Sequence, residues 1–275
     1  MSYAAVITHV QADEMAAPRL RCAVETAARF GADLIGVAAE MVPPLLFNDG
    51  IYPMEADWTI AMRETIEGRL KSACDAFDKA TDTLGHRARR LSGLRLPSPA
   101  MAAASRAADL IVAGGASRRM HDAYRDCSSA ELALTAGRPV LVAPPNPAPL
   151  DAKRILLAWK DTREARRALS DSLPFLEKAD QVVITSVCPQ SEADDAKLQV
   201  EDVAAALNRR GVKAEAHVAV HAHPDGFQIL REAIRMGADL VVLGAYGHSR
   251  LGEWVFGGVT ADLLAQDEVY LLLSH

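Results

Sequence analysis

One stretch of this chain is present twice. The segment AADLIVAG, from Ala107 to Gly114, returns 130 residues later as GADLVVLG, from Gly237 to Gly244. At the same offset the run that starts at Arg138 matches the run that starts at Glu268, and AVITHV near the beginning matches RILLAW at an offset of 149. Each copy must fold into the same unit, so this repeat constrains the fold more than any other feature. With 275 residues the chain is long enough for two domains.

Within each copy, short apolar runs alternate with stretches of helical periodicity. Ile155–Leu157 and Leu240–Leu243 are apolar at every position, which is typical of parallel strands that helices cover on both faces. The alternation predicts an α/β fold with two tandem, doubly wound domains, each built on a five-stranded parallel sheet with right-handed crossovers. Strands are expected near 4–10, 33–39, 87–91, 109–113 and 139–143 in the first copy, and near 154–159, 181–187, 213–220, 239–244 and 269–273 in the second. Helices of the second copy are expected near 162–177, 192–210, 225–236 and 258–266.

The two copies also predict the domain bounds. Residues 1–143 and 154–275 would be the two domains, and residues 144–153 the linker. Four of the six residues from Pro144 to Pro149 are proline, which cannot continue a helix or a central strand, so we expect a stiff linker there. The first copy is nineteen residues longer between its first strand and the repeated segment. We place this extra length in a loop from Met41 to Trp58, which is rich in Pro, Asn, Asp and Gly.

Charge and composition exclude several classes of protein. The chain has 36 acidic and 30 basic residues, a net charge of −6, which is the wrong sign for binding nucleic acid phosphates. The longest segments without a charged residue have only twelve residues, too few to cross a membrane, and the first lacks the basic start of a signal peptide. The four cysteines are widely scattered, so we expect reduced thiols rather than disulfides or a metal site. We therefore expect a cytoplasmic protein with neither nucleic acid nor membrane as partner.

The most informative segment runs from Gly244 to Thr260. It follows the predicted fourth strand of the second copy and leads into its last helix, a place where α/β sheets bind ligands. Glycines let backbone N–H groups approach an anion closely, and the start of the helix adds free N–H groups and the positive end of its dipole. This chemistry suits phosphate groups, although the glycines would also serve a simple strand-to-helix turn. The matching segment of the first copy, from Gly114 to Ser129, lacks glycines in its far half, so we expect the first copy to differ in its ligand.

The spacing of these glycines resembles that of the universal stress protein family. Its nucleotide-binding members carry G-x2-G-x9-G-[S/T] after the fourth strand, and Gly244, Gly247 and Gly257 have this spacing. The resemblance covers nearly all of both copies. It implies a tandem protein in which two Rossmann-like domains, similar to adenine nucleotide alpha hydrolases, form an internal pseudo-dimer. It also implies a stress-response protein that senses or regulates through a bound adenine nucleotide (ATP, ADP or AMP), with Mg2+ as an accompanying ion.

The resemblance also implies where the nucleotide would bind. The site would lie in the second domain, between the end of its first strand and the glycine loop, with backbone amides holding the phosphates and residues 158–160 beside the base and ribose. The expected nucleotide-binding residues are Ala158, Trp159, Lys160, Val187, Leu243, Gly244, Gly247, His248, Ser249, Gly257, Gly258, Val259 and Thr260. No catalytic residue and no metal ligand is expected, and hydrolysis of ATP would at most be slow.

Two positions depart from the family pattern. The last position of the glycine motif is Gly258 instead of Ser or Thr, and Thr260 lies two residues further on. The Asp that the family places at the end of its first strand is replaced by Lys160 in the second copy and by Gln11 in the first. Lys160 is therefore either a contact to an anionic group of a changed ligand or a solvated lysine at a strand end.

Other classes of function stay open. The substitutions at Lys160 and Gly258 would fit a binder of another anionic metabolite. They would also fit an interaction module without a nucleotide, which would form a homo-oligomer through its exposed sheet edges. An ATP-consuming enzyme would need an acidic metal cluster beside the phosphates, and Glu253 and Asp262 are the only carboxylates close to the loop in sequence.

Three further patterns have simpler structural explanations. His217, His221 and His223 fall on one face of a predicted strand and with Asp225 would offer zinc ligands, but Pro224 ends that strand. His248 and Ser249 are adjacent in sequence, and adjacent side chains rarely point together as a catalytic pair needs. The apolar positions Trp58, Met62, Ile66, Leu70 and Phe77 indicate one buried face of a long amphipathic helix.

Overall fold

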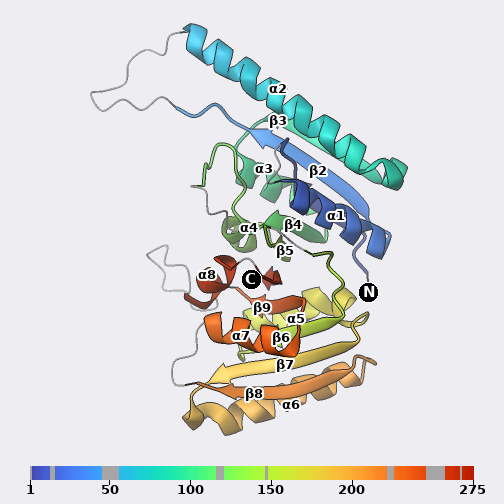
Figure 1. The fold of residues 1–275 in the computed structure, drawn as a ribbon, viewed down its shortest axis with the longest axis vertical. Helices are drawn as coiled ribbons and strands as arrows, with labels where there is room; N and C mark the ends of the chain where they lie inside the picture. Colours follow the sequence, from blue (N-terminus) through green and yellow to red (C-terminus); the bar gives the residue numbers. More distant parts are fainter. Residues whose placement is uncertain are drawn as a thin grey trace, which may run out of the picture.

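The chain forms one ten-stranded sheet with helices on both faces (Figure 1). The computed structural model describes residues 2–12, 16–44, 56–115, 121–145, 148–221, 226–245, 258–266 and 268–275. The first half contains β1 (Ala5–His9), α1 (Ala17–Phe30), β2 (Asp33–Glu40), α2 (Ala56–Ala80), β3 (Ala88–Leu94), α3 (Pro97–Ala104), β4 (Leu110–Gly114), α4 (Ser129–Thr135) and β5 (Val140–Ala143). The second half contains β6 (Arg154–Ala158), α5 (Arg163–Leu176), β7 (Gln181–Cys188), α6 (Ala193–Asn208), β8 (Ala214–Val220), α7 (Gly226–Met236), β9 (Leu240–Gly244), α8 (Gly258–Leu264) and β10 (Tyr270–Ser274). Short 3-10 helices lie at Asp82–Arg87, Ser105–Ala107 and Gln190–Glu192.

The predicted α/β fold class is confirmed. The sheet has the strand order β3-β2-β1-β4-β5-β10-β9-β6-β7-β8, and within each half all neighbouring strands are parallel. Every predicted strand is present, with ends that differ by at most a few residues. One difference concerns the predicted loop from Met41 to Trp58, because α2 already begins at Ala56.

The two halves join through an antiparallel pair at the centre of the sheet. Strands β5 and β10 pair with Leu141 opposite Leu272, so the two five-stranded sheets become one continuous sheet. Both strands are buried along their whole length, as expected for apolar residues covered on two faces. The internal pseudo-dimer is therefore formed edge to edge.

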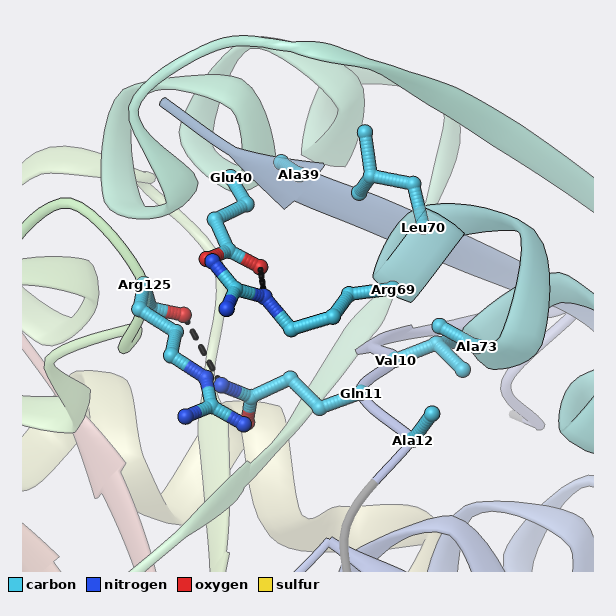
Figure 2. A pocket seen from close by; sticks show the side chains of 9 residues that line it. All are labelled: Val10, Gln11, Ala12, Ala39, Glu40, Arg69, Leu70, Ala73 and Arg125. Atoms are coloured by element: carbon cyan, nitrogen blue, oxygen red, sulfur yellow. Dashed lines mark hydrogen bonds and ion pairs between the residues drawn. The ribbon is translucent and has the colours of Figure 1, made fainter. Parts of the chain in front are cut away.

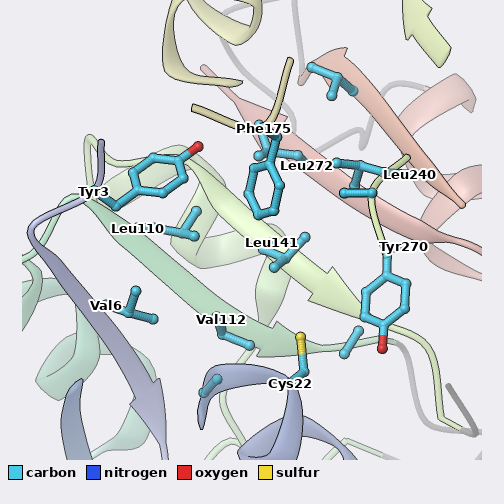
Figure 3. Packing of buried hydrophobic residues seen from close by; sticks show 14 of the residues in the cluster. Tyr3, Val6, Cys22, Leu110, Val112, Leu141, Phe175, Leu240, Tyr270 and Leu272 are labelled. Carbon is cyan, nitrogen blue, oxygen red and sulfur yellow. The ribbon is translucent and has the colours of Figure 1, made fainter. Parts of the chain in front are cut away.

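Helices cover the sheet in two layers, each with its own hydrophobic core. On one face α1, α2, α5 and α6 pack against the sheet, and on the other face α3, α4, α7 and α8 do so. Figure 3 shows the first of these cores, in which Leu110 and Leu141 of one half lie in the same cluster as Leu240 and Leu272 of the other. Each core therefore extends across the joint between the halves.

Helix α2 packs as the apolar periodicity predicts. Ile66, Leu70 and Phe77 are buried, and Met62 is partly buried against the same core. The Phe77 ring lies so close to β2 that a Cβ on Gly36 would come within 2.6 Å of it. Glycine at this position thus lets the aromatic ring lie directly on the sheet.

The segment between the halves is held by both of them. The Tyr270 hydroxyl donates a hydrogen bond to the carbonyl of Ala148 (2.8 Å), and the Arg29 guanidinium donates one to the carbonyl of Leu150 (3.1 Å). Ala152 is completely buried and has a positive φ of 46°. These contacts fix the described part of the predicted linker against the domains. None of the helices in the described ranges is long and apolar enough to span a membrane.

Candidate functional site

The direction of the strand order reverses between β6 and β9 in the second half. These two strands are neighbours, with Ala158 opposite Leu243, yet the chain continues from β6 toward β7 and from β9 toward β10, on opposite sides. The crevice beyond the carboxyl ends of such strands is where open α/β sheets bind ligands. Trp159 and Lys160 follow β6 at this point, and Ala245 follows β9. The fold therefore brings together the predicted residues from 158–160 and 243–244.

Trp159 carries a buried polar group without a partner. Its backbone N–H continues the strand ladder with a 2.8 Å hydrogen bond to the carbonyl of Thr185. The side chain is only 8% exposed, and its indole Nε1 has no hydrogen-bond partner among the described residues. The hydroxyl of Thr185 is likewise buried and unpaired in the part of the chain that the structure covers. Because buried donors in proteins are nearly always paired, this indole N–H is a candidate contact to a ligand.

Lys160 lies beside this tryptophan and is exposed to solvent. Its carbonyl accepts a hydrogen bond from the backbone N–H of Thr162 (2.6 Å), which turns the chain into α5. The next residue, Asp161, forms an ion pair with Arg166. Within the described ranges no carboxylate pairs with the Lys160 ammonium, so this cation can meet an anion that arrives from solution.

Gly244 is required for close packing of the helix on the strand. A Cβ on this residue would lie 2.5 Å from the backbone nitrogen of Ala165 and 2.6 Å from the carbonyl carbon of Glu164. The first turn of α5, capped by the Thr162 hydroxyl, therefore lies directly on the end of β9. The first glycine of the predicted motif thus has a structural role in this protein.

Glu164 is an ionised carboxylate at the same place. It is 7% exposed, and burial alone would raise its pKa. Hydrogen bonds from its own backbone N–H, from Thr162 and from Arg163 outweigh that effect and hold the pKa below its ordinary value. Its position in the first turn of α5 also places the negative charge at the favourable end of the helix dipole.

The remaining predicted residues divide into two groups. Val187 is half-buried, Leu243 and Thr260 are buried, and Val259 is partly exposed. Gly258 is exposed, and a Cβ there would meet no atom within 4 Å. Gly247, His248, Ser249 and Gly257 lie outside the described residues, as do His223 and Asp225.

Of the four possible zinc ligands considered in the sequence, only His217 and His221 lie among the described residues, and the described part of the chain holds no group of three potential metal ligands. His217 instead lies 3.3 Å from the Glu232 carboxylate, which also pairs with Arg235 at 2.7 Å. Burial would raise the pKa of Glu232, but hydrogen bonds and charge from Arg235, with His217, lower it overall.

The first half has a pocket that the sequence analysis missed. It lies at the carboxyl ends of β1 and β2 against α2, as Figure 2 shows. The Glu40 carboxylate forms an ion pair with Arg69 inside it, and the Gln11 amide donates a 2.8 Å hydrogen bond to the carbonyl of Arg125. The residues that line it are Val10, Gln11, Ala12, Ala39, Glu40, Arg69, Leu70, Ala73 and Arg125. Ligands of α/β sheets bind beyond the carboxyl ends of the strands. Applied to the first copy, this rule predicts Gln11 and Glu40, but not Arg69, which lies on α2.

This pocket is too small for a nucleotide in the structure as it stands. Its volume is about 30 Å³, which is room for about two water molecules. The Arg19 guanidinium donates to the Gln11 side chain (2.9 Å) and to the carbonyl of His9 (2.9 Å), so it lies at the carboxyl end of β1. By the repeat, Val10 in this half corresponds to Trp159 in the other. The two halves therefore differ at matching positions.

His9 is buried behind this pocket. It is 1% exposed, and its Nε2 donates a hydrogen bond to the carbonyl of Ala39 (3.1 Å). Burial and the nearby positive charge of Arg19 lower the pKa of His9 to about 3. The imidazole is therefore neutral at physiological pH.

Comparison with known proteins assigns the second half of the chain to a family. Residues 152–272 match the universal stress protein family. This half is a universal stress protein domain. The resemblance to this family predicted from the spacing of the glycines is thus confirmed for the second half. No curated protein sequence shows significant similarity to the chain.

Solved structures extend the likeness in fold to the whole chain. The fold is similar to that of a universal stress protein from Archaeoglobus fulgidus DSM 4304, with a TM-score of 0.69 and 15% sequence identity. The match covers 98% of this chain and 95% of the Archaeoglobus chain. A proposed universal stress protein from Pseudomonas aeruginosa UCBPP-PA14 has a TM-score of 0.61 and 16% sequence identity to this chain. The match covers 99% of this chain and 93% of the Pseudomonas chain. These matches include both halves, so the first half shares the fold that accompanies the universal stress protein domain.

Proposed function

We propose that this stress-response protein binds an adenine nucleotide in its second half, at the carboxyl ends of β6 and β9. The observation that carries the proposal is the buried indole N–H of Trp159, which has no partner among the described residues and lies where the strand order reverses. The protein would act in the cytoplasm as a sensor or regulator, with at most slow hydrolysis of ATP.

The chemistry of the residues at this point supports a ligand that has both hydrogen-bond acceptors and negative charge. A buried donor without an acceptor costs about 1–3 kcal/mol, which a base or ribose oxygen or nitrogen would offset. The exposed ammonium of Lys160, directly adjacent in sequence, would meet a phosphate. Mg2+ would accompany the phosphates as a counter-ion. No residue in the described ranges is assigned as its ligand.

A second candidate is another anionic metabolite. It is favoured by Lys160 and Gly258, which stand where nucleotide-binding relatives carry Asp and Ser or Thr. A ligand with a carboxylate or a phosphate but no adenine would use the same lysine and the same indole donor.

The first experiment is mass spectrometry of small molecules released by denaturing freshly purified protein. It is followed by calorimetric titration with ATP, ADP and AMP. Nucleotide at a ratio near one per chain would support the proposal. A different copurifying anion would favour the second candidate, and a protein that neither contains nor binds any of these ligands would contradict both.

Substitutions then test the place of binding. Gly258→Val should weaken nucleotide binding at little cost in stability, because a Cβ at this position would meet no atom of the described residues within 4 Å. Lys160→Glu should weaken it about tenfold, a change of about 1.4 kcal/mol. The matched control is Lys213→Glu, an exposed residue before β8 at the opposite ends of the strands. Equal effects of the two lysine variants would place the ligand elsewhere.

A further inference from the structure

Strand β3 forms one outer edge of the ten-stranded sheet, alongside α2 at one end of the molecule (Figure 1). An edge strand presents backbone N–H and C=O groups that no neighbouring strand uses, which makes it a template for another strand. Four consecutive residues of β3, from Arg89 to Ser92, are exposed. Leu91 is among them, with 43% of its surface exposed.

The side chains of β3 alternate between a covered and an uncovered face. Arg90 lies opposite Gly36 of β2 and forms an ion pair with Asp78 of α2 at 2.8 Å. Arg89 and Leu91 lie on the other face, opposite Ile35 and Val37. On that face, Arg89 has no carboxylate partner within the described ranges. A cation and an apolar side chain two residues apart are thus available together on one face.

The sequence around β3 is strongly basic although the chain is acidic overall. Between Asp82 and Asp109 there is no acidic residue, whereas the same segment holds five arginines. Arg95, just beyond the strand, is exposed as well. This local charge is opposite in sign to the net charge of −6.

The opposite edge of the sheet is different. Strand β8 corresponds to β3 in the second half, but it carries Glu215 at the position of Arg89 and His217 at the position of Leu91. The Gln181 amide donates a hydrogen bond to Glu215 (3.3 Å), and His217 lies against Glu232. The charged groups of β8 are therefore already engaged with neighbouring residues.

We propose that the β3 edge binds an extended acidic segment of a partner protein as an eleventh strand. The partner's backbone would pair with the free edge of β3, as in other cases of strand addition. On the face that Arg89 and Leu91 share, the segment would place a carboxylate beside Arg89 and an apolar side chain two residues away beside Leu91. Pairing of two β3 edges from different copies is disfavoured, because it would bring arginines next to arginines.

The test uses a fluorescently labelled peptide in which glutamate and valine alternate at every second position, with threonine between them. Its binding to the full chain is measured by fluorescence anisotropy at low salt. The control peptide has the same composition, with glutamate and valine on opposite faces of the strand. The patterned peptide should bind about tenfold more tightly than the control, and binding should weaken as salt screens the charges. Methylation of its backbone nitrogens should abolish binding.

Variants of the protein separate the edge from general electrostatics. Arg89→Glu should weaken peptide binding about tenfold, while Arg210→Glu, which changes the net charge equally in the second half, should leave it unchanged. Leu91→Thr should reduce the preference for the patterned peptide, and it tests the edge without any change of charge. Lys160→Glu should have no effect, because this edge is independent of the proposed nucleotide site.

Four results would overturn the proposal. One is equal affinity for the two peptides, and another is equal loss in the Arg89 and Arg210 variants. The third is a dimer by light scattering that Leu91→Lys converts to a monomer, which would show that a second copy covers the edge. Tighter binding of a DNA duplex than of the peptide would also contradict it.

Discussion

The Tyr3 hydroxyl, before the first strand, donates a 2.6 Å hydrogen bond to the carbonyl of Asp171 in α5 of the other half. The Tyr3 ring also packs with Phe30 and Phe175, with ring centroids 5.0 and 5.7 Å away. Phe30 and Phe175 lie edge to face at 4.9 Å. This aromatic cluster and its hydrogen bond connect the two halves on the face that α1 and α5 cover.

Tyr3→Phe should reduce the free energy of unfolding by about 1 kcal/mol, because the ring packing is kept and the carbonyl of Asp171 loses its donor. Chemical denaturation of the two proteins measures the difference. Tyr124→Phe is the control, because within the described ranges its hydroxyl has no hydrogen bond. An equal effect at both positions would show that the Tyr3 bond adds nothing to the joint.

Gly244→Ala should destabilise the protein by about 2 kcal/mol or more, because the new methyl group would overlap the backbone of α5. Gly258→Ala should change stability by less than about 1 kcal/mol, since its Cβ enters open space. Thermal unfolding of both variants provides the comparison. Similar melting temperatures would mean that α5 can move away from β9 at little cost.

His9 should make the protein less stable as the pH falls. Its pKa is about 3 in the folded protein and about 6.5 in an unfolded chain. Below pH 6.5 the unfolded state therefore binds a proton that the folded state does not, and stability decreases until about pH 3. At pH 5 the loss would be about 2 kcal/mol. Urea unfolding from pH 7 to pH 5 should show a smaller loss for His9→Gln, and parallel curves would contradict the assignment.

Glu40 and Arg69 should show coupled effects on stability. The Glu40 carboxylate is buried, so Arg69→Met removes its partner, whereas the double variant with Glu40→Gln leaves no unpaired charge. We expect a coupling energy of about 1–2 kcal/mol in a double-mutant cycle, reduced by the partial exposure of Arg69. Additive effects of the two substitutions would show that the ion pair does not stabilise the fold.

The repeat and the apolar runs were enough to predict the fold, because buried parallel strands such as Leu240–Leu243 have a clear sequence pattern. The antiparallel pairing of Leu141 with Leu272 could not be predicted, since nothing in either strand specifies a partner from the other copy. The same is true of Arg69, whose position in the pocket depends on how α2 lies on the sheet. The glycine spacing predicted the family, but Gly247 and Gly257 lie outside the described residues, so their contacts remain predictions.

The central β5–β10 pair also affects how the sequences of the two halves can evolve. In a dimer of identical chains, one substitution alters both sides of the interface at once. Here the two sides belong to different stretches of one polypeptide, so a mutation alters one side and leaves the other to compensate. A tyrosine at position 3 can therefore face a phenylalanine at position 175, and Gln11 and Lys160 can diverge at matching strand ends. Permanent pairing within one chain makes the two halves free to specialise.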